Sequence, residues 1–251
     1  TMIYQNVLEA IGETPLIELQ RMNRPEAARV LVKYEGLNVG GSIKTRTALN
    51  MIEAGEKAGQ INKDTVIVEP TSGNQGIGLA LIGAVRGYRT VIIMPDSVSE
   101  ERRLLVQHYG AEVKLIHDAG DIGACIRECI ALAQRMAADD PRVFVPQQFV
   151  NRDNLAAHVD GTAAEILADV RAAEPEHAAL LSGGAIGTHV QMGIGDGILP
   201  AIMDTALIDE IVVVTDEEAL ECARRLAREE GLFAGISSGT NVAAALRFCL
   251  L

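Results

Sequence analysis

Short apolar runs alternate along this chain with longer helical patterns, and this alternation restricts the fold more than any other feature of the sequence. Most of the runs are apolar throughout, instead of alternating between apolar and polar residues. Continuous runs of this kind are typical of strands that are buried on both faces of a parallel sheet. We expect strands at residues 29–35, 65–70, 90–95, 112–116, 143–146 and 210–215.

Helical patterns fill much of the chain between and after these runs. Ser99 is expected to be the N-cap of one helix and Gly110 to end it. The βαβα order predicts an α/β fold with a mostly parallel sheet flanked by helices. Because ligands in such folds bind beyond the carboxyl ends of the strands, the strand-to-helix turns are the first places to search for a site. The expected helices cover residues 74–88, 99–110, 121–138 and 216–231.

Composition and charge exclude several classes of function. The chain has 251 residues and a formal net charge of −12, so no basic face is available for nucleic acid or an anionic membrane. No apolar run reaches the roughly 18–20 residues that a membrane-spanning helix needs. The first residues lack a basic segment followed by an apolar core, so we expect no signal peptide and a cytoplasmic location.

The cysteines do not form a metal or redox motif. None belongs to a CxxC pair, and none lies at zinc-ligand spacing from a histidine. We expect buried or incidental thiols and no metal, with a redox or metal role as the alternative. Cys125 and Cys129 are four residues apart and should share one helix face. The other two are Cys222 and Cys249.

The turn after the strand at 65–70 carries the first candidate chemistry. Its sequence, TSGNQGIG (71–78), places two hydroxyls, two side-chain amides and three glycines at a helix start. Glycines allow the backbone to approach a ligand closely, and amides at a helix start attract carboxylates or phosphates. The alternative is a helix that is merely well capped. Two further glycine-rich turns, at 193–200 and 235–241, are weaker signals, and we expect the latter to precede a helix.

Lys44 is the second candidate. Of the five lysines, only this one lies in a glycine–serine turn at the start of a helical pattern, within GGSIKTR. The positive end of a helix and a confined site lower the pKa of an amine, and such an amine attacks carbonyl groups to form a Schiff base. Taken without context, an ordinary surface lysine is the alternative.

Several longer motifs, taken together and in order, resemble one family. From about Asn6 to Leu246 the chain resembles the O-acetylserine sulfhydrylase (cysteine synthase) and cystathionine β-synthase family of fold-type II pyridoxal-phosphate enzymes. The motifs are GGSIKTR, EPTSGNQGIGLALIGAVRGY, MPDSVSEERRLL, YGAEV, PQQF, LSGGAIGTHVQMGIGDGILP and GISSGTNVAAAL.

This resemblance implies a role for each matching residue. Lys44 would bind the cofactor, pyridoxal 5'-phosphate, as a Schiff base and move the substrate α-proton. Asn74 would hydrogen-bond the cofactor's phenolic oxygen, and Ser237 its pyridine nitrogen. Because a hydroxyl does not keep the ring nitrogen protonated, the ring is a weaker electron sink, which suits elimination at Cβ. The implied substrate-binding residues are Thr71, Ser72, Gly73, Gln75, Gln148 and Gly193.

The resemblance also implies the reaction and its setting. It is a β-replacement in which O-acetylserine and sulfide give cysteine and acetate through an aminoacrylate intermediate. Alternatives are replacement on serine with another nucleophile, as in cystathionine β-synthase, or a non-catalytic homologue. Family members are usually homodimers, and some bind the C-terminal tail of serine acetyltransferase. The implied fold has two lobes, each with a mostly parallel sheet: residues 35–146 form one, and 1–34 with 147–251 form the larger.

The chain departs from the family pattern at three places. Near residues 170–173 it lacks about one βαβ unit, including the GTGGT loop that binds the cofactor phosphate in the family. Either the sequence omits a segment of a longer protein, which we favour, or the protein is a shortened and inactive homologue. Thr45 replaces the usual Asp, and Gln75 the usual Thr, which leaves the leaving group and the nucleophile open.

Overall fold

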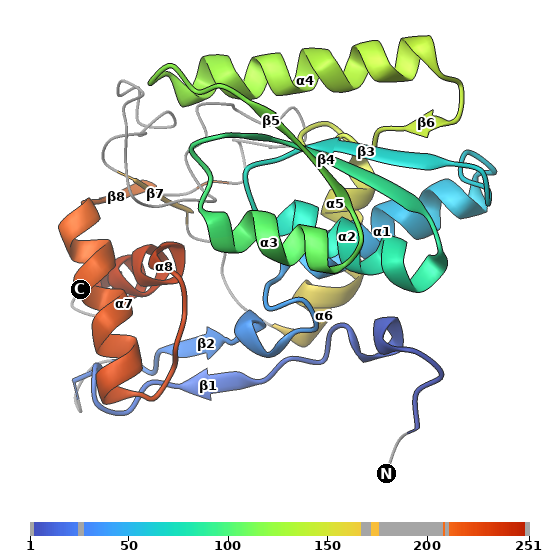
Figure 1. Ribbon diagram of the computed structural model, residues 1–251. Coiled ribbons are helices and arrows are strands. Elements are labelled where there is room, and N and C mark those ends of the chain that lie inside the picture. Colours follow the sequence, from blue (N-terminus) through green and yellow to red (C-terminus); the bar gives the residue numbers. More distant parts are fainter. Residues whose placement is uncertain (1–2, 25–27, 167–171, 176–207, 209–210, 249–251) are drawn as a thin grey trace. The chain divides into compact units, whose positions relative to one another are not determined.

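A computed structural model describes most of the chain as two compact units (Figure 1). The lobe limits expected from the sequence stay a prediction. The structure describes residues 3–24, 28–166, 172–175, 208 and 211–248. Of these, 3–13 and 37–166 belong to the first unit, and 14–24, 28–36, 172–175, 208 and 211–248 to the second.

The first unit is built on a four-stranded parallel sheet, as the apolar runs predicted. The strand order is β5-β4-β3-β6, and every neighbouring pair is parallel. In the central pair, Val68 lies opposite Val91. The strands are β3 (Val66–Pro70), β4 (Arg89–Pro95), β5 (Glu112–Ile116) and β6 (Val143–Phe144).

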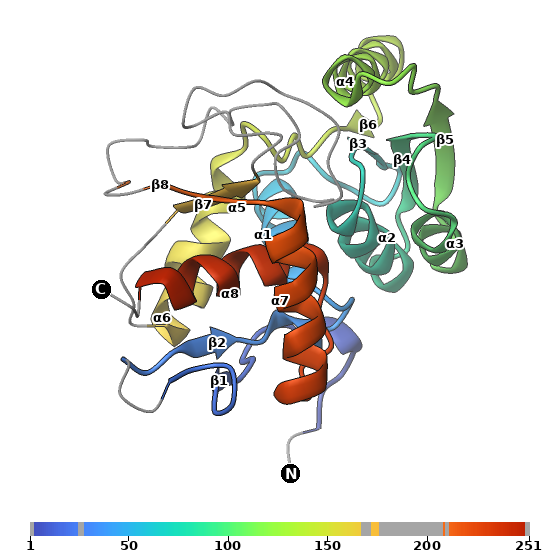
Figure 2. The same cartoon turned by 90° about the vertical axis from the view of Figure 1, so that its left-hand side faces the viewer.

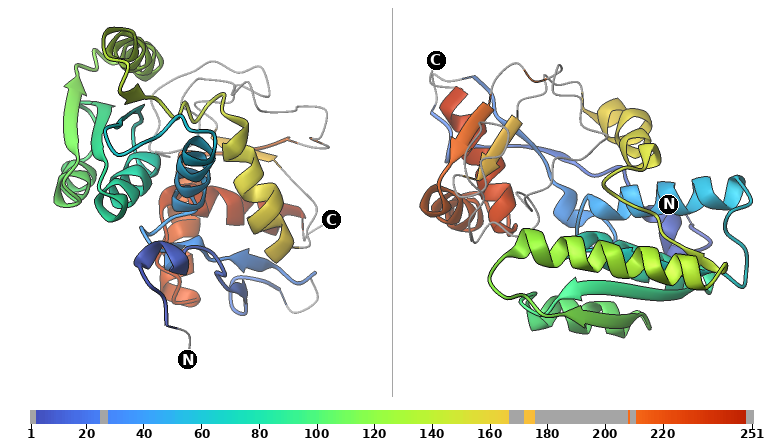
Figure 3. Two further views of the ribbon diagram at one scale, coloured as in Figure 1. Left: turned by 90° about the vertical axis from the view of Figure 1, so that its right-hand side faces the viewer. Right: turned by 90° about the horizontal axis from the view of Figure 1, so that it is seen from above.

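Helices cover both faces of this sheet (Figures 1 and 3). One helix packs on Val66, Val68, Val91 and Ile93, whereas three others pack on the opposite face, where Ile67 and Ile92 lie. The first is α4 (Ile122–Asp139), and the three are α1 (Lys44–Lys57), α2 (Asn74–Arg86) and α3 (Glu100–His108). The shorter elements of this unit are η1 (Val7–Ala10), α5 (Arg152–Ala157), the π-helical turn η3 (His158–Thr162) and α6 (Ala163–Glu165).

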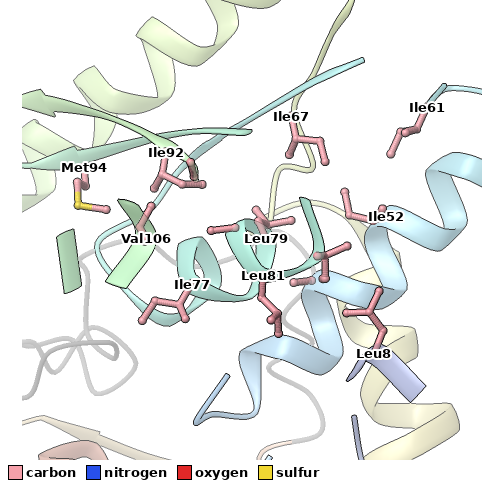
Figure 4. Close-up of a cluster of buried hydrophobic side chains, with 14 of the residues drawn as sticks. Leu8, Ile52, Ile61, Ile67, Ile77, Leu79, Leu81, Ile92, Met94 and Val106 are labelled. Carbon is pink, nitrogen blue, oxygen red and sulfur yellow. The ribbon is translucent and has the colours of Figure 1, made fainter. Parts of the chain in front are cut away.

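The main core lies between β3, β4 and the helices α1 and α2 (Figure 4). Ile52 of α1, Leu79 of α2 and Ile67 of β3 are completely buried in it. The strands β3 and β4 are buried on both faces, as expected, but β5 is not, and Leu115 is 45% exposed. The order of the sheet explains the difference, because among the described strands β5 lies at the edge and pairs with β4 alone.

The described residues of the second unit form two small sheets and two helices (Figure 2). The expected strand at 29–35 is shorter, and it pairs antiparallel with a strand that the sequence analysis missed, so its assignment to a parallel sheet was wrong. One face of this two-stranded sheet packs on the cluster that contains Leu19, Val30 and Leu226, whereas Leu31 is exposed to solvent. The elements are β1 (Leu16–Glu18), β2 (Leu31–Lys33), β7 (Ala172–Pro175), β8 (Ile211–Val214), α7 (Asp216–Glu229) and α8 (Ile236–Phe248); η2 (Glu35–Leu37) lies where the chain passes between the units.

The predicted helix ends agree with the structure. Ser99 is the N-cap residue of α3, although its side chain makes no capping hydrogen bond, and Gly110 adopts a left-handed conformation just beyond the helix. Thr215 and Glu218 form a reciprocal capping box at the start of α7. Over the described ranges, no helix combines the length and the apolar composition needed to cross a bilayer.

Gly78 sets the distance between α1 and α2. A Cβ at this position would lie 3.0 Å from the Ala48 Cβ, 3.2 Å from the Lys44 carbonyl oxygen and 3.2 Å from the Thr45 Cα. Two of these three atoms belong to the backbone of α1, which cannot move without moving the helix. The absence of a side chain at Gly78 therefore holds the lysine turn against the first turns of α2.

We predict that Gly78→Ala destabilises the protein. The added methyl group overpacks the helix contact, and such overpacking costs about 1–3 kcal/mol of unfolding free energy. Urea unfolding followed by circular dichroism measures the change. Gly123→Ala in α4 is the matched control, because its Cβ would meet only side-chain tips of Arg127 and Asp121 at 3.4 Å. The control should be neutral or stabilised by up to about 1 kcal/mol; equal effects in both variants would contradict the prediction.

Candidate active site

Lys44 is the first residue of α1, as the sequence predicted. Gly40 and Gly41 precede it with φ angles of +82° and +75°, which side chains rarely adopt. The Lys44 backbone N–H donates to the Ser42 Oγ at 3.3 Å. The lysine is half-buried, and its carbonyl group lies against Gly78 of α2. A turn that favours glycine thus brings the backbone of Lys44 to the α1–α2 contact.

The second turn connects β3 to α2 at the carboxyl edge of the sheet. Thr71, Ser72 and Gly73 are buried, whereas Asn74 is exposed at the first position of α2. The Thr71 Oγ1 accepts the Gly73 backbone N–H at 3.3 Å, and the Thr71 N–H donates to the Ile93 carbonyl of β4 at 2.9 Å.

No side chain caps α2, because its N-cap residue is Gly73. The side-chain-capped helix that was the alternative for this turn is therefore not what forms. Amides at the start of an uncapped helix are suited to an anionic ligand. Anion binding at TSGNQGIG stays a prediction.

Gln75 has a different environment from its neighbour Asn74. Its side chain is 2% exposed, and its Oε1 accepts a hydrogen bond from the Thr47 Oγ1 at 2.8 Å. Thr47 is one turn beyond Lys44, and its hydroxyl also lies 2.9 Å from the Lys44 carbonyl oxygen. Within the part of the chain that the structure describes, the Gln75 Nε2 has no hydrogen-bond partner. The residue that departs from the family pattern thus connects α2 with the helix turn that carries the lysine.

Gln148 lies in the turn that follows β6. Its side chain is 8% exposed, and its Nε2 donates to the Pro70 carbonyl oxygen at 3.4 Å. Pro70 directly precedes Thr71, so the structure brings the PQQF segment and the TSGN segment together. Two of the sequence-predicted substrate elements are therefore neighbours at one edge of the sheet.

Glu69 is a residue of this region that the sequence analysis missed. Its carboxylate is completely buried and accepts the backbone N–H groups of Gln147 and Gln148, each at 2.9 Å. Burial raises the pKa of Glu69 to about 7, and the hydrogen bonds from the Gln148 and Gln147 backbones oppose that rise. The available signal was an acidic residue inside an otherwise apolar strand, TVIVEP.

Arg102 of α3 was also missed. Its Nη1 lies 3.5 Å from the Ser72 carbonyl oxygen, and a Cβ on Gly73 would come within 3.4 Å of the same guanidinium nitrogen. A positive charge therefore lies beside the turn that is predicted to bind a carboxylate. Sequence spacing gave no hint of this, because α3 follows a different strand.

The remaining predicted residues lie elsewhere. Ser237 is half-buried in the second unit. The expectation that its turn precedes a helix was wrong: α8 begins at Ile236, and the Ser238 N–H already bonds to the Gly235 carbonyl at 3.0 Å. Gly239 lets this segment pack on α7 as a helix, because the glycine has no side chain and its backbone lies directly against the Ala219 carbonyl group. Gly193, Cys249 and the turn at 193–200 lie outside the described residues, and of the suspected deletion near 170–173 only Ala172 and Ala173, the first residues of β7, are described.

The described cysteines are buried. Cys125 and Cys129 share the face of α4 that packs on the sheet, as predicted. Burial raises the pKa of Cys129 to about 12 and that of Cys222 to about 11. These thiols therefore stay protonated at neutral pH and are poor nucleophiles. Among the described residues, no cluster of His, Cys, Asp and Glu is arranged to hold a metal ion.

An amine at a glycine-rich helix start, beside an uncapped second helix in an α/β fold, defines an enzyme class that handles carbonyl compounds. Comparisons with known proteins agree. Residues 7–195 and 169–250 match the family described as pyridoxal-phosphate dependent enzyme. The chain belongs to this family, and its cofactor is pyridoxal 5'-phosphate.

Three named proteins show which enzymes of this family the chain is similar to. A cysteine synthase of Flavobacterium sp. is 40% identical over 93% of this chain and 85% of its own. A hydrogen sulfide-producing enzyme from Fusobacterium nucleatum has a TM-score of 0.92 and 38% identity, over 98% of this chain and 93% of its own. An O-acetylserine dependent cystathionine β-synthase from Helicobacter pylori has a TM-score of 0.91 and 30% identity, over 100% of this chain and 92% of its own.

The described residues fit this cofactor. Lys44 supplies a half-buried amine at a helix start, and Asn74 supplies an exposed amide at the start of the adjoining helix. These are the donor types that an aldehyde and a ring oxygen require. The segment where the family's phosphate loop is expected, near 170–173, lies only partly within the described residues.

The raised pKa of Glu69 predicts a pH-dependent stability. This carboxyl group ionises near pH 4.5 in the unfolded chain and at about 7 in the folded protein. The folded state therefore holds the proton more tightly, and the contribution of Glu69 to stability is largest below pH 4.5 and declines as the pH rises to 7. Since one pKa unit corresponds to 1.36 kcal/mol, the wild type should lose roughly 2–3 kcal/mol relative to Glu69→Gln between pH 5 and pH 8.

Urea unfolding of both proteins at the two pH values measures this difference. Other ionisable groups are shared, so their contributions cancel between the wild type and the variant. A constant difference between the two proteins across this pH range would contradict the prediction.

Proposed function

We propose that this enzyme catalyses a β-replacement in which O-acetylserine and sulfide give cysteine and acetate. The observation that carries the proposal is the position of Lys44, at the start of α1 and against the first turns of α2. The Flavobacterium relative is named cysteine synthase, and O-acetylserine appears in the name of the H. pylori structure. The first name supports cysteine as the product, and the second supports O-acetylserine as the first substrate.

The proposed roles follow from the chemistry that each side chain can perform. When bound, pyridoxal 5'-phosphate supplies an electron sink next to the substrate α-carbon. The Lys44 Nζ holds the cofactor, then takes the proton from the α-carbon and later returns it. The Asn74 amide would orient the cofactor ring, and the Ser237 hydroxyl would hydrogen-bond its nitrogen. The substrate α-carboxylate is bound by Thr71, Ser72, Gly73, Gln75, Gln148 and Gly193.

A second candidate uses the same half-reaction with a different nucleophile or leaving group. Two buried residues that depart from the family pattern support this second candidate. Gln75 accepts a hydrogen bond from Thr47, and the Thr45 Oγ1 lies 3.3 Å from the Ser42 carbonyl oxygen. Both contribute to the turns around Lys44. The similar solved structures include a cystathionine β-synthase and a hydrogen sulfide-producing enzyme. Enzymes similar to this chain thus have different names and reactions, so nucleophiles other than sulfide should also be tested.

The assembly and setting of the enzyme are also proposals. A homodimer, a cytoplasmic location and binding of a serine acetyltransferase C-terminal tail are supported by the sequence resemblance alone.

Lys44→Ala should fold but lose both the visible absorbance of bound cofactor and the turnover. Without the amine, nothing holds the cofactor covalently or moves the α-proton, and the loss of turnover should exceed about 10³-fold. The assay follows cysteine formation from O-acetylserine and sulfide. Lys57→Ala, at the exposed end of the same helix, is the control and should match the wild type. Wild-type rates in Lys44→Ala would refute the role of Lys44, and an inactive wild type would refute the proposed reaction.

Gln75→Thr should change the preference among nucleophiles without abolishing cofactor binding. The shorter side chain no longer reaches across the α1–α2 contact to Thr47, so the turn beside Lys44 is rearranged. The measured quantity is the ratio of kcat/KM for sulfide to kcat/KM for an organic thiol, with O-acetylserine as the first substrate. We expect a change on the order of tenfold. An unchanged ratio would exclude Gln75 from specificity.

A further inference from the structure

Glu69 is an acidic residue in the interior of a parallel sheet. It lies next to Pro70 at the end of β3, opposite Ile92 of β4, and is 0% exposed. A buried carboxylate is costly unless hydrogen bonds compensate for its lost hydration. Here both carboxylate oxygens accept backbone N–H groups, one from Gln147 and one from Gln148. The side chain is therefore committed to a segment 78 residues further along the chain.

These two backbone groups need a partner because the sheet ends just before them. The strands β3 and β6 pair only at Val66–Val143 and Ile67–Phe144. Gln147 then adopts a φ of +60°, an uncommon conformation for a residue with a side chain. At this kink the backbone leaves the direction of the strand, so its N–H groups cannot continue the ladder. The Glu69 carboxylate takes the place of the next strand residue as acceptor.

The same turn is held from the other side. The Asn154 Nδ2 donates to the Gln148 carbonyl oxygen at 2.7 Å, and the Asn151 Nδ2 donates to the Pro146 carbonyl oxygen at 2.9 Å. The backbone of Gln148 is thus fixed at both its N–H and its C=O. Its side-chain amide then lies beside Pro70, at the entrance to the TSGN turn.

We propose that Glu69 is a positioning residue for substrate binding: its carboxylate holds the Gln147–Gln148 backbone and thereby places the Gln148 amide beside the TSGN turn. This inference rests on the proposed function, in which that turn and Gln148 bind the substrate α-carboxylate. Glu69 itself contacts no substrate. It couples two segments, one after β3 and one after β6, into a single binding edge.

Glu69→Gln tests the proposal in the holoenzyme. The amide keeps the size of the side chain and one carbonyl oxygen, but its NH₂ group faces a backbone N–H, so one of the two hydrogen bonds is lost. The KM for O-acetylserine should rise about tenfold with kcat nearly unchanged, the pattern expected when substrate binding alone is weakened. Hydrogen exchange of the backbone amides in residues 146–151 should accelerate by about tenfold, because a hydrogen bond to a charged acceptor is lost.

Glu165→Gln is the matched control. The Glu165 carboxylate also accepts hydrogen bonds, two from the Arg46 guanidinium at 2.7 and 2.8 Å and one from the Glu13 backbone N–H at 3.2 Å, and both partners lie outside the turn at 146–149. This variant should leave the KM and the exchange of residues 146–151 unchanged. An equal rise of KM in both variants would show a general loss of stability and would overturn the proposal. An unchanged KM or unchanged exchange in folded Glu69→Gln would also overturn it.

Two further measurements separate the possible failures. If Glu69→Gln does not fold, Glu69→Asp replaces it: the shorter carboxylate reaches at most one of the two amides, so a raised KM supports the proposal and a wild-type KM overturns it. If the wild type does not turn over O-acetylserine, the proposed function fails. Equilibrium dialysis with L-serine and hydrogen exchange then test the positioning role of Glu69. Weaker L-serine binding together with faster exchange in Glu69→Gln would support this role, and wild-type values in either measurement would refute it.

Discussion

The close contact between α1 and α2 at Gly78 is the constraint on which the rest of the site depends. A hydrogen atom in place of a side chain lets the backbone of Lys44 and Thr45 pack directly on α2. One helix start carries the amine, and the other carries Asn74 and the TSGN turn. Because both helices also pack on β3 and β4, the sheet fixes their positions along its carboxyl edge. Lys44 and the TSGN turn are therefore held by the core of the first unit.

The strands could be predicted where burial alone determines the pattern. The runs at 65–70 and 90–95 are apolar throughout because β3 and β4 are central and covered on both faces. The run at 29–35 was misassigned, since a short apolar run does not distinguish a parallel partner from an antiparallel one. The strand β1 was missed because it has three residues, and its stability comes from pairing with β2.

Only those site residues that belong to a recognisable local sequence motif could be predicted. Lys44 stands out because its glycine–serine turn precedes a helix. Glu69 and Arg102 do not, because their partners are backbone groups of distant segments: the amides of Gln147 and Gln148, and the carbonyl of Ser72. The left-handed conformation of Gln147, which creates the need for an acceptor, is likewise a consequence of where β6 ends. Sequence spacing carries no information about such contacts.

An enzyme with a formal net charge of −12 must attract the carboxylate of its proposed amino-acid substrate with local groups. The first turn of α2, uncapped by any side chain, and the Arg102 guanidinium beside Gly73 supply such groups. In its ionised form, which predominates only above a pH of about 7, the Glu69 carboxylate works against them, because a buried negative charge at the same sheet edge repels a second one. Its two backbone amides offset that charge with oriented dipoles, which cost no further reorganisation when a substrate arrives. The same hydrogen bonds that hold the Gln148 turn in place thus also reduce the repulsion between Glu69 and a carboxylate bound at the TSGN turn.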